Sequence, residues 1–375
     1  MSTNPLYLCQ ECVKDNRLKL YYTTTKIEKN KCSFCDKVHE RCKNIDDNDE
    51  LINLITALIR YHYSEELYNR HWGGEHLNVL LEVENELLEV SPTEDFEEAL
   101  DVLICFLGNN YMENGNNVDL YYGHDNEGTR GCYFYSIKES KNHFLQALEN
   151  DLLKYNYFLY EEKVNAHILP FMQYYEQNLA AGSQFYRARI GYHNRTSTEG
   201  FILPMINYFP YTNETIGAPD TKLVSGGRLN RPGVSFLYMA TNVDTAINEV
   251  RPDPGHKVSI GTFKSTQDLR IVNFDKAFLD LCVTEESLGT FTSLNHIDQL
   301  FSHPITKDER EQYIITQFFA DIFRKQGFDG IQFTSSVGSG KNILIFNPGH
   351  FVYVKDDVNK VYEVAKLQYT VNRLP

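Results

Sequence analysis

The sequence lacks long hydrophobic runs. No stretch of its 375 residues approaches the roughly 18 consecutive apolar residues that a membrane-spanning helix requires. The first residues, MSTNPLYLCQEC, also lack the basic and apolar segments that open a secretory signal peptide. We therefore expect no membrane insertion and a cytoplasmic location.

Positive charge is scarce as well. The chain carries 36 Lys and Arg against 51 Asp and Glu, a formal net charge of -15, and its basic residues form no continuous stripe. Because this balance repels phosphate backbones, binding of nucleic acid through bulk electrostatics is not expected. An anionic ligand would have to be bound by local groups.

Five of the eight cysteines lie within the first 42 residues. The first four follow the pattern C-x2-C-x19-C-x2-C, formed by Cys9, Cys12, Cys32 and Cys35. Two such pairs supply four thiolates for a tetrahedral Zn(II), and a closed four-thiolate site is structural. Redox-active pairs and unrelated buried thiols are the alternatives, and His39 or Cys42 could replace one ligand. The alternation around Leu18 and Leu20 predicts a hairpin between the pairs.

Helical patterns dominate residues 46–181. The segment ELINLITALIRYHY, residues 50–63, places its apolar side chains on one broad face. A further helix is predicted for residues 75–90. A capping box at residues 91–94 predicts the start of another helix, and a third is predicted for roughly residues 140–179. We expect a helical bundle, broken by a Gly/Asn-rich loop at 109–132.

One short segment of this bundle could carry chemistry. Arg70, His71 and His76 have an arginine and histidine spacing that some helical ribonucleases use. Two glycines interrupt the segment and the flanking chain is not basic, so a loop between helices is the preferred interpretation.

The pattern changes after Gly182. Short runs of aromatic and β-branched residues, separated by turn residues, predict strands at 183–193, 234–241, 257–263, 268–274, 328–335 and 341–348. Helices are predicted at 243–250 and 308–327. The expected fold class is α+β, with a zinc ribbon over residues 1–45, a helical domain over 46–181 and a compact α+β domain over 182–375.

Polar residues gather in one segment of this last domain. Gly226 and Gly227 precede Arg228, which would let a strand edge present its guanidinium to a phosphate or carboxylate. Tyr238 follows in a predicted strand, and Glu249 borders the apolar face of a predicted helix. Taken singly, these residues also fit a surface ion pair, a core tyrosine and a solvated glutamate.

The segment GGRLNRPGVSFLYMATNVDTAINEVRP, residues 226–252, resembles the signature of RES-domain proteins, which are named for an arginine, a glutamate and a serine. The serine would be Ser335 or Ser336. The segments around Arg187 and Gln317 also resemble this family. The paired cysteines and following helices resemble the HEPN-like N-terminal region of some of its members, so the resemblance covers nearly the whole chain.

This resemblance implies an ADP-ribosyltransferase-like fold that consumes NAD+, in a toxin that an antitoxin or regulatory protein controls. Glu249 would stabilise the oxocarbenium-like ribose, Arg228 would bind the pyrophosphate, and Tyr238 would stack on the nicotinamide. Further ligand contacts would come from Arg187, Arg189, Asn230, Gln317, Ser335 and Ser336.

We expect an NAD+ glycohydrolase from these features. Transfer of ADP-ribose to a macromolecule uses the same residues with a different acceptor, and phosphorolysis is a close variant. A non-enzymatic interaction module with an inert RES-like part is a third interpretation. Homo-oligomerisation stays open.

Overall fold

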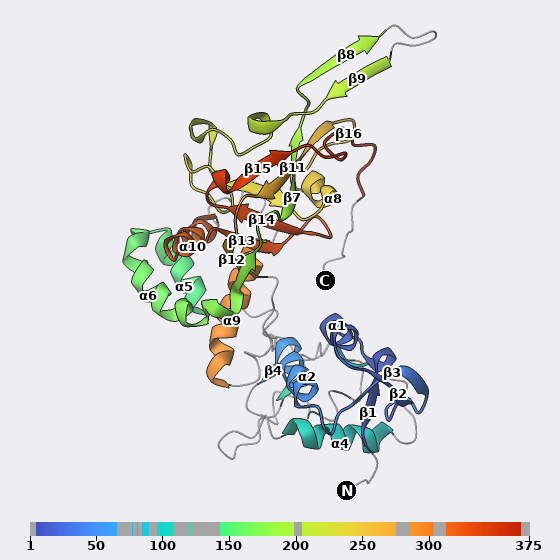
Figure 1. Cartoon of the computed structure of the whole chain (residues 1–375). Coiled ribbons are helices and arrows are strands. Elements are labelled where there is room, and N and C mark those ends of the chain that lie inside the picture. Colours follow the sequence, from blue (N-terminus) through green and yellow to red (C-terminus); the bar gives the residue numbers. More distant parts are fainter. Residues whose placement is uncertain are drawn as a thin grey trace, which may run out of the picture. The chain divides into compact units, whose positions relative to one another are not determined.

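The computed structural model describes residues 5–65, 77, 81, 85–89, 96–108, 120–121, 143–198, 205–274, 285–302 and 313–368. The chain forms two compact units: residues 1–142 with 278–295, and residues 143–277 with 296–375 (Figure 1). The domain boundaries predicted after residues 45 and 181 stay predictions. The capping box, the Arg70–His76 segment and nearly all of the Gly/Asn-rich loop lie outside the described residues.

A three-stranded antiparallel sheet in the first unit carries the cysteine pairs. Its strands, in spatial order, are β1 (Tyr7–Cys9), β3 (Val38–Asn44) and β2 (Glu28–Lys31). The hairpin predicted between the cysteine pairs is wrong, because Asn16–Thr24, which includes Leu18 and Leu20, forms helix α1. Asp15 caps α1 by accepting hydrogen bonds from two backbone amides, and Leu18 and Tyr22 are buried one turn apart while Leu20 is 61% exposed. The apolar period is therefore helical.

Two predicted helices of this unit are confirmed. They are α2 (Asp49–His62), which Asn48 caps, and α4 (Phe96–Gly108), and they pack against each other. The helix predicted over residues 75–90 does not extend through residues 85–89. There the Asn85 side chain accepts hydrogen bonds from the amides of Leu87 and Leu88, and Leu88 forms a β-bridge with Val13. Strands β4 (Ser64–Glu65) and β5 (Leu120–Tyr121) form a separate short pair.

The second unit begins with short helices. They are α5 (His143–Leu152), η3 (Tyr157–Tyr160), α6 (Glu161–Ile168), η4 (Leu169–Phe171) and α7 (Met172–Tyr175). The helix predicted to reach residue 179 stops earlier, since Glu176–Leu179 forms strand β6. Pairing with the edge of a larger sheet overrides the helical pattern there. Helix α9 (Glu285–Ser302) crosses from the first unit into the second.

A nine-stranded sheet forms the centre of the second unit. Its main path runs β15 (Phe351–Val354), β11 (Lys257–Ser265), β7 (Gln184–Ile190), β10 (Leu237–Ala240), β14 (Lys341–Ile345), β13 (Gly330–Thr334), β12 (Leu269–Asn273) and β6. Strand β16 (Val361–Glu363) pairs with β11, and only the β12–β13 pair among these described strands is parallel. Each predicted strand is confirmed, and so is the α+β class.

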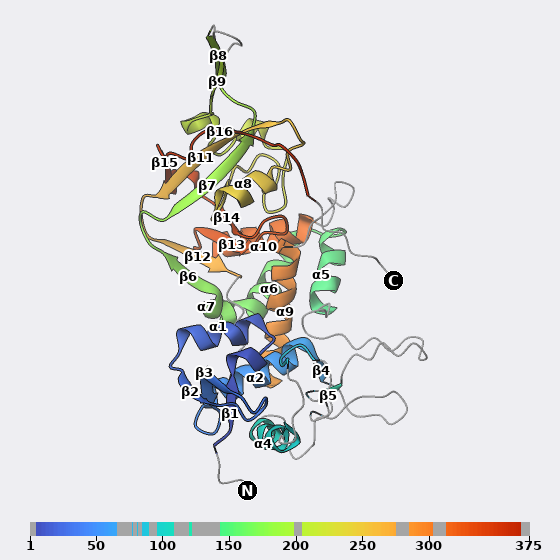
Figure 2. The same ribbon diagram turned by 90° about the vertical axis from the view of Figure 1, so that its right-hand side faces the viewer.

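Two helices and a hairpin complete this unit. Helix α8 (Val243–Glu249) packs on β7, β10 and β11 through Ala246, and α10 (Tyr313–Lys325) lies against β13. Both were predicted. The hairpin of β8 (Asn194–Thr198) and β9 (Met205–Phe209) was not, and it projects from the sheet in both views (Figures 1 and 2).

No helix among the described residues has both the length and the apolar character that crossing a bilayer requires.

Candidate functional site

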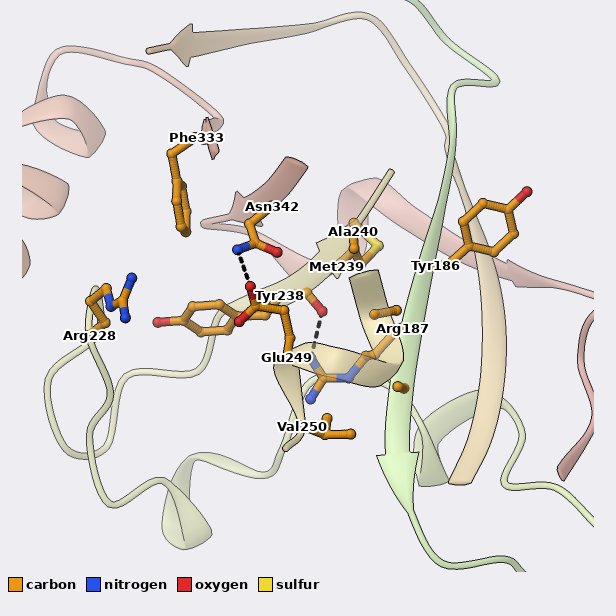
Figure 3. A pocket seen from close by; sticks show the side chains of 12 residues that line it. Tyr186, Arg187, Arg228, Tyr238, Met239, Ala240, Glu249, Val250, Phe333 and Asn342 are labelled. Carbon is orange, nitrogen blue, oxygen red and sulfur yellow. Dashed lines mark hydrogen bonds between the residues drawn. The ribbon is translucent and has the colours of Figure 1, made fainter. Parts of the chain in front are cut away.

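A cavity of about 310 Å³ lies in the second unit, beside strands β7 and β10 and helix α8 (Figure 3). The side chains that line it are Tyr186, Arg187, Ala188, Arg228, Tyr238, Met239, Ala240, Ala246, Glu249, Val250, Phe333 and Asn342. The structure thus brings together Arg228, Tyr238 and Glu249, all from one segment of the sequence, with Arg187 from another.

Glu249 ends helix α8, and its carboxylate is held from one side. Its Oε1 atom accepts a hydrogen bond from Asn342 Nδ2 at 2.7 Å (Figure 3). The same atom accepts a second hydrogen bond from Ser335 Oγ at 2.6 Å. Its Oε2 atom makes no hydrogen bond to any other residue that the structure describes. The carboxylate is therefore fixed in direction while one oxygen stays available to a ligand.

Ser335, not Ser336, contacts this carboxylate. Ser335 is buried just after β13, and its Oγ atom also accepts hydrogen bonds from the amides of Val337 and Gly338, at 3.2 and 3.0 Å. The amide of Gly340 donates to Thr245 Oγ1 at 2.9 Å, which ties the same loop to helix α8. Ser336 is exposed.

Arg228 lies on a loop. The expectation that a strand edge presents it is wrong, because residues 224–236 contain no strand, and Gly226 has a φ of 88°, which glycine adopts freely. The Arg228 guanidinium donates to the backbone carbonyl of Phe301. Gln317 Nε2 donates to the carbonyl of Gly227 at 2.7 Å, so Gln317 supports the loop and is not among the residues lining the cavity.

Tyr238 and Asn230 hold the same loop from the other side. The Tyr238 hydroxyl donates to Asn230 Oδ1 at 2.7 Å and accepts from the amide of Leu229 at 3.3 Å. Asn230 is buried and donates to the carbonyl of Val234 at 3.0 Å. Burial raises the pKa of Tyr238, so the phenol stays neutral near pH 7.

Arg187 reaches the cavity from β7, whereas Arg189 does not line it. The Arg187 guanidinium donates to the carbonyls of Ile216 and Tyr238, at 2.8 and 2.7 Å. Burial lowers the pKa of Arg187 to about 10, which still leaves it charged near pH 7. Arg189 is exposed, and its guanidinium lies 4.4 Å from the centre of the Tyr211 ring.

A second cavity of about 220 Å³ shares Arg187 and Tyr238 with the first. Most of its remaining lining is apolar and comes from the chain before β10, including Leu223, Val234 and Phe236. Asn230 also lines it. Because the two cavities share these lining residues, a ligand too large for the first cavity could extend into the second.

The sequence did not predict Asn342 or Phe333 as site residues. They are partners in the register of β13 and β14. Asn342 is an amide in the otherwise apolar run NILIF and is 8% exposed. A buried side-chain amide in such a run needs a polar partner. The presence of Asn342 in this apolar run was therefore the one feature of the sequence that could have indicated a site residue here.

The four N-terminal cysteines form a compact cluster. All four Sγ atoms lie within 4.8 Å of one another, with 3.9 Å between Cys9 and Cys35 and between Cys12 and Cys32. Tetrahedral zinc at about 2.3 Å from each sulfur requires about 3.8 Å between sulfurs, so these residues could hold the ion. Cys42 lies outside the cluster and donates to the carbonyl of Asn30, while His39 Nε2 is 3.3 Å from Cys35 Sγ.

Comparison with protein families gives a match to part of the chain. Residues 209–371 match the RES domain family. The match contains Arg228, Tyr238, Glu249 and Ser335, while strand β7 with Arg187 and Arg189 precedes it.

The solved structures add little. The crystal structure of the M. tuberculosis MbcT–MbcA toxin–antitoxin complex is 11% identical, with a TM-score of 0.29, over 52% of this chain and 88% of that one. This likeness is too weak to assign a fold or a function. None of the curated proteins matches the chain.

Proposed function

We propose that the second unit cleaves NAD+ between ribose C1 and nicotinamide and releases ADP-ribose, with water as the acceptor. The main support is the Glu249 carboxylate, which Ser335 and Asn342 fix in a cavity that two arginines also line. The match to the RES domain family gives further support.

The chemistry requires few groups from the protein. Nicotinamide leaves from NAD+ as a neutral molecule, so the leaving group needs no strong acid, and the barrier lies in the oxocarbenium-like ribose. A carboxylate aimed beforehand at this developing cation stabilises the transition state without reorganising. Glu249 would do this through its unbonded oxygen, which could also orient the attacking water.

The arginines would bind the pyrophosphate. Arg187 and Arg228 line the cavity with charged guanidinium groups, whose planar donors match phosphate oxygens. Tyr238 would offer its ring face to the nicotinamide, because its hydroxyl is already bonded to Asn230.

Product analysis of the purified full chain with NAD+ tests this proposal. Nicotinamide and free ADP-ribose in equal amounts support hydrolysis. ADP-ribose 1-phosphate formed only when phosphate is present indicates phosphorolysis, and label transferred to macromolecules indicates a transferase. No NAD+ turnover under any of these conditions would favour the interaction module.

Arg228→Ala is expected to raise KM for NAD+ by about tenfold and to lower kcat much less. A group that binds the pyrophosphate acts on the ground state and the transition state alike. Steady-state kinetics measure both constants, with Arg195→Ala on the projecting hairpin as a control that removes the same charge. An unchanged KM with a collapsed kcat would place Arg228 in the chemical step instead.

We also propose that Cys9, Cys12, Cys32 and Cys35 bind one structural Zn(II). Elemental analysis should find about one zinc per chain, and Cys12→Ser should lose it because three thiolates remain. Cys42→Ser is the matched control, since Cys42 is buried outside the cluster, and it should keep the metal. Full zinc content in Cys12→Ser would contradict this ligand set.

The cellular role we infer is that of a cytoplasmic toxin or defence effector that depletes NAD+. An antitoxin or regulatory protein would then control it. This inference rests on the RES match and on the proposed reaction. Induced expression of the native chain should lower the cellular NAD+ concentration. Expression of Glu249→Gln should leave the NAD+ concentration unchanged.

A further inference from the structure

His39 stands beside the cluster of four cysteines, at the start of strand β3. Its half-buried ring has a neighbour on each nitrogen: Nε2 lies 3.3 Å from Cys35 Sγ, and Nδ1 lies 3.2 Å from Glu11 Oε2. In a tetrahedral zinc site a sulfur and a nitrogen ligand lie about 3.6 Å apart. The ring is therefore already near ligand distance from Cys35.

The Glu11 carboxylate determines which ring nitrogen offers a lone pair to the cysteines. A neutral histidine carries one ring proton, and a carboxylate beside Nδ1 favours the tautomer with the proton there. Nε2, on the side of Cys35, then presents its lone pair. Histidines that bind metals commonly donate their other ring N–H to a carboxylate in this way. His39 and Glu11 thus have the arrangement of a metal ligand and its outer partner.

The four cysteines differ in how easily one of them could be replaced. Three are buried, whereas Cys35 is only partly buried, so its displacement costs the least packing. His39 lies near Cys9 as well, because ligand atoms of Cys9, Glu11 and His39 all lie within 4.8 Å of one another. Cys12 belongs to no second group of this kind in the part of the chain that the structure describes. A spare ligand is therefore available beside Cys35 and not beside Cys12.

A simpler role for His39 is to donate a hydrogen bond to the Cys35 sulfur. In the neutral ring that role puts the proton on Nε2, and the Nδ1 lone pair would then face the Glu11 carboxylate at 3.2 Å, an unfavourable contact between two acceptors. A positively charged ring would satisfy both neighbours without binding a metal. This is the alternative that an experiment has to exclude.

We propose that His39 is a reserve ligand of the metal, which takes the position of Cys35 through Nε2 when that thiolate leaves the metal. The ion is then held by three thiolates and one imidazole, a ligand set that structural zinc sites use. This inference rests on the proposed zinc site and goes beyond it. One of the four ligand positions can exchange between sulfur and nitrogen, while the three buried thiolates keep the ion in place.

The zinc content of purified full-chain variants tests the exchange. Cys35→Ser should keep about one zinc per chain, in contrast to Cys12→Ser, which has no histidine beside the lost thiolate. The double variant of Cys35→Ser with His39→Ala should lose the metal. His39→Ala alone is the matched control and should keep it, because all four thiolates remain.

Cobalt(II) in place of zinc identifies the ligands, since its charge-transfer absorption grows with the number of bound thiolates. Cys35→Ser should stay tetrahedral with about three quarters of the native charge-transfer absorption. Zinc loss from Cys35→Ser as complete as from Cys12→Ser would overturn the proposal, and so would retention of zinc by the double variant. If the native chain keeps zinc while Cys35→Ser does not, only the exchange fails. If the native chain binds no zinc, the proposed site fails together with it.

Discussion

Glu249→Gln is expected to slow NAD+ cleavage by about a hundredfold or more while the fold and most of the NAD+ affinity persist. A preorganised charge aimed at a developing cation contributes about 3 to 4 kcal/mol to transition-state stabilisation. The amide has nearly the same shape, and its oxygen can still accept hydrogen bonds from Ser335 and Asn342. The substitution therefore removes the charge and little else.

Single-turnover measurements of nicotinamide release test this expectation, with circular dichroism to verify the fold. Asp244→Asn is the matched control, because Asp244 is an exposed carboxylate in the first turn of the same helix. It should cleave NAD+ at the wild-type rate. Near-native activity of Glu249→Gln would show that the proposed mechanism is wrong.

The contacts of Glu249 connect distant parts of the chain. Ser335 follows β13, Asn342 lies in β14, and Glu249 ends α8, and the loop between β13 and β14 is tied to α8 through Thr245. A Cβ atom on Gly338 would lie 2.9 Å from the Thr245 Cα atom, so this loop packs closely against the helix. The sheet and helix thus orient the carboxylate before a ligand binds.

Local patterns predicted most of the fold of the second unit. Its predicted strands are rich in aromatic and β-branched residues, and this signal does not depend on distant partners. One error arose where a distant partner decides: β6 forms because Leu179 pairs with Leu269, which cannot be read from the segment itself. The error at α1 was a local one, because its cap Asp15 directly precedes the helix and the brief alternation around Leu18 and Leu20 was given more weight than this helix start signal.

The residues of the candidate site also fall into two groups, those that one sequence segment contains and those that depend on distant pairing. Arg228, Tyr238 and Glu249 were predictable because one segment contains them all. Asn342 depends on the register between β13 and β14, which no local pattern contains. Ser335 and Ser336 could not be separated in the sequence, because neighbouring residues after a strand differ in direction and only the packed structure shows which one is buried.

The register of β13 and β14 also leads to the second large effect. Gly330→Ala is expected to lower the free energy of unfolding by about 3 kcal/mol. A Cβ atom on Gly330 would lie 2.3 Å from the carbonyl oxygen of Leu344 and 2.8 Å from Ile345 Cδ1. The carbonyl cannot move away alone, because β14 pairs with β13 on one side and with β10 on the other.

Tyr238 is the β10 partner of Leu344, so a displaced β14 would disturb the cavity together with the sheet. Denaturant unfolding of Gly330→Ala measures the loss, with Gly349→Ala as the control. A Cβ atom on Gly349 would come no closer than 3.2 Å to another group, the Asn347 side chain, so its effect should stay within about 0.5 kcal/mol. Equal stability of the two variants would mean that β13 and β14 do not pack at this register, and Asn342 would then lose its place beside Glu249.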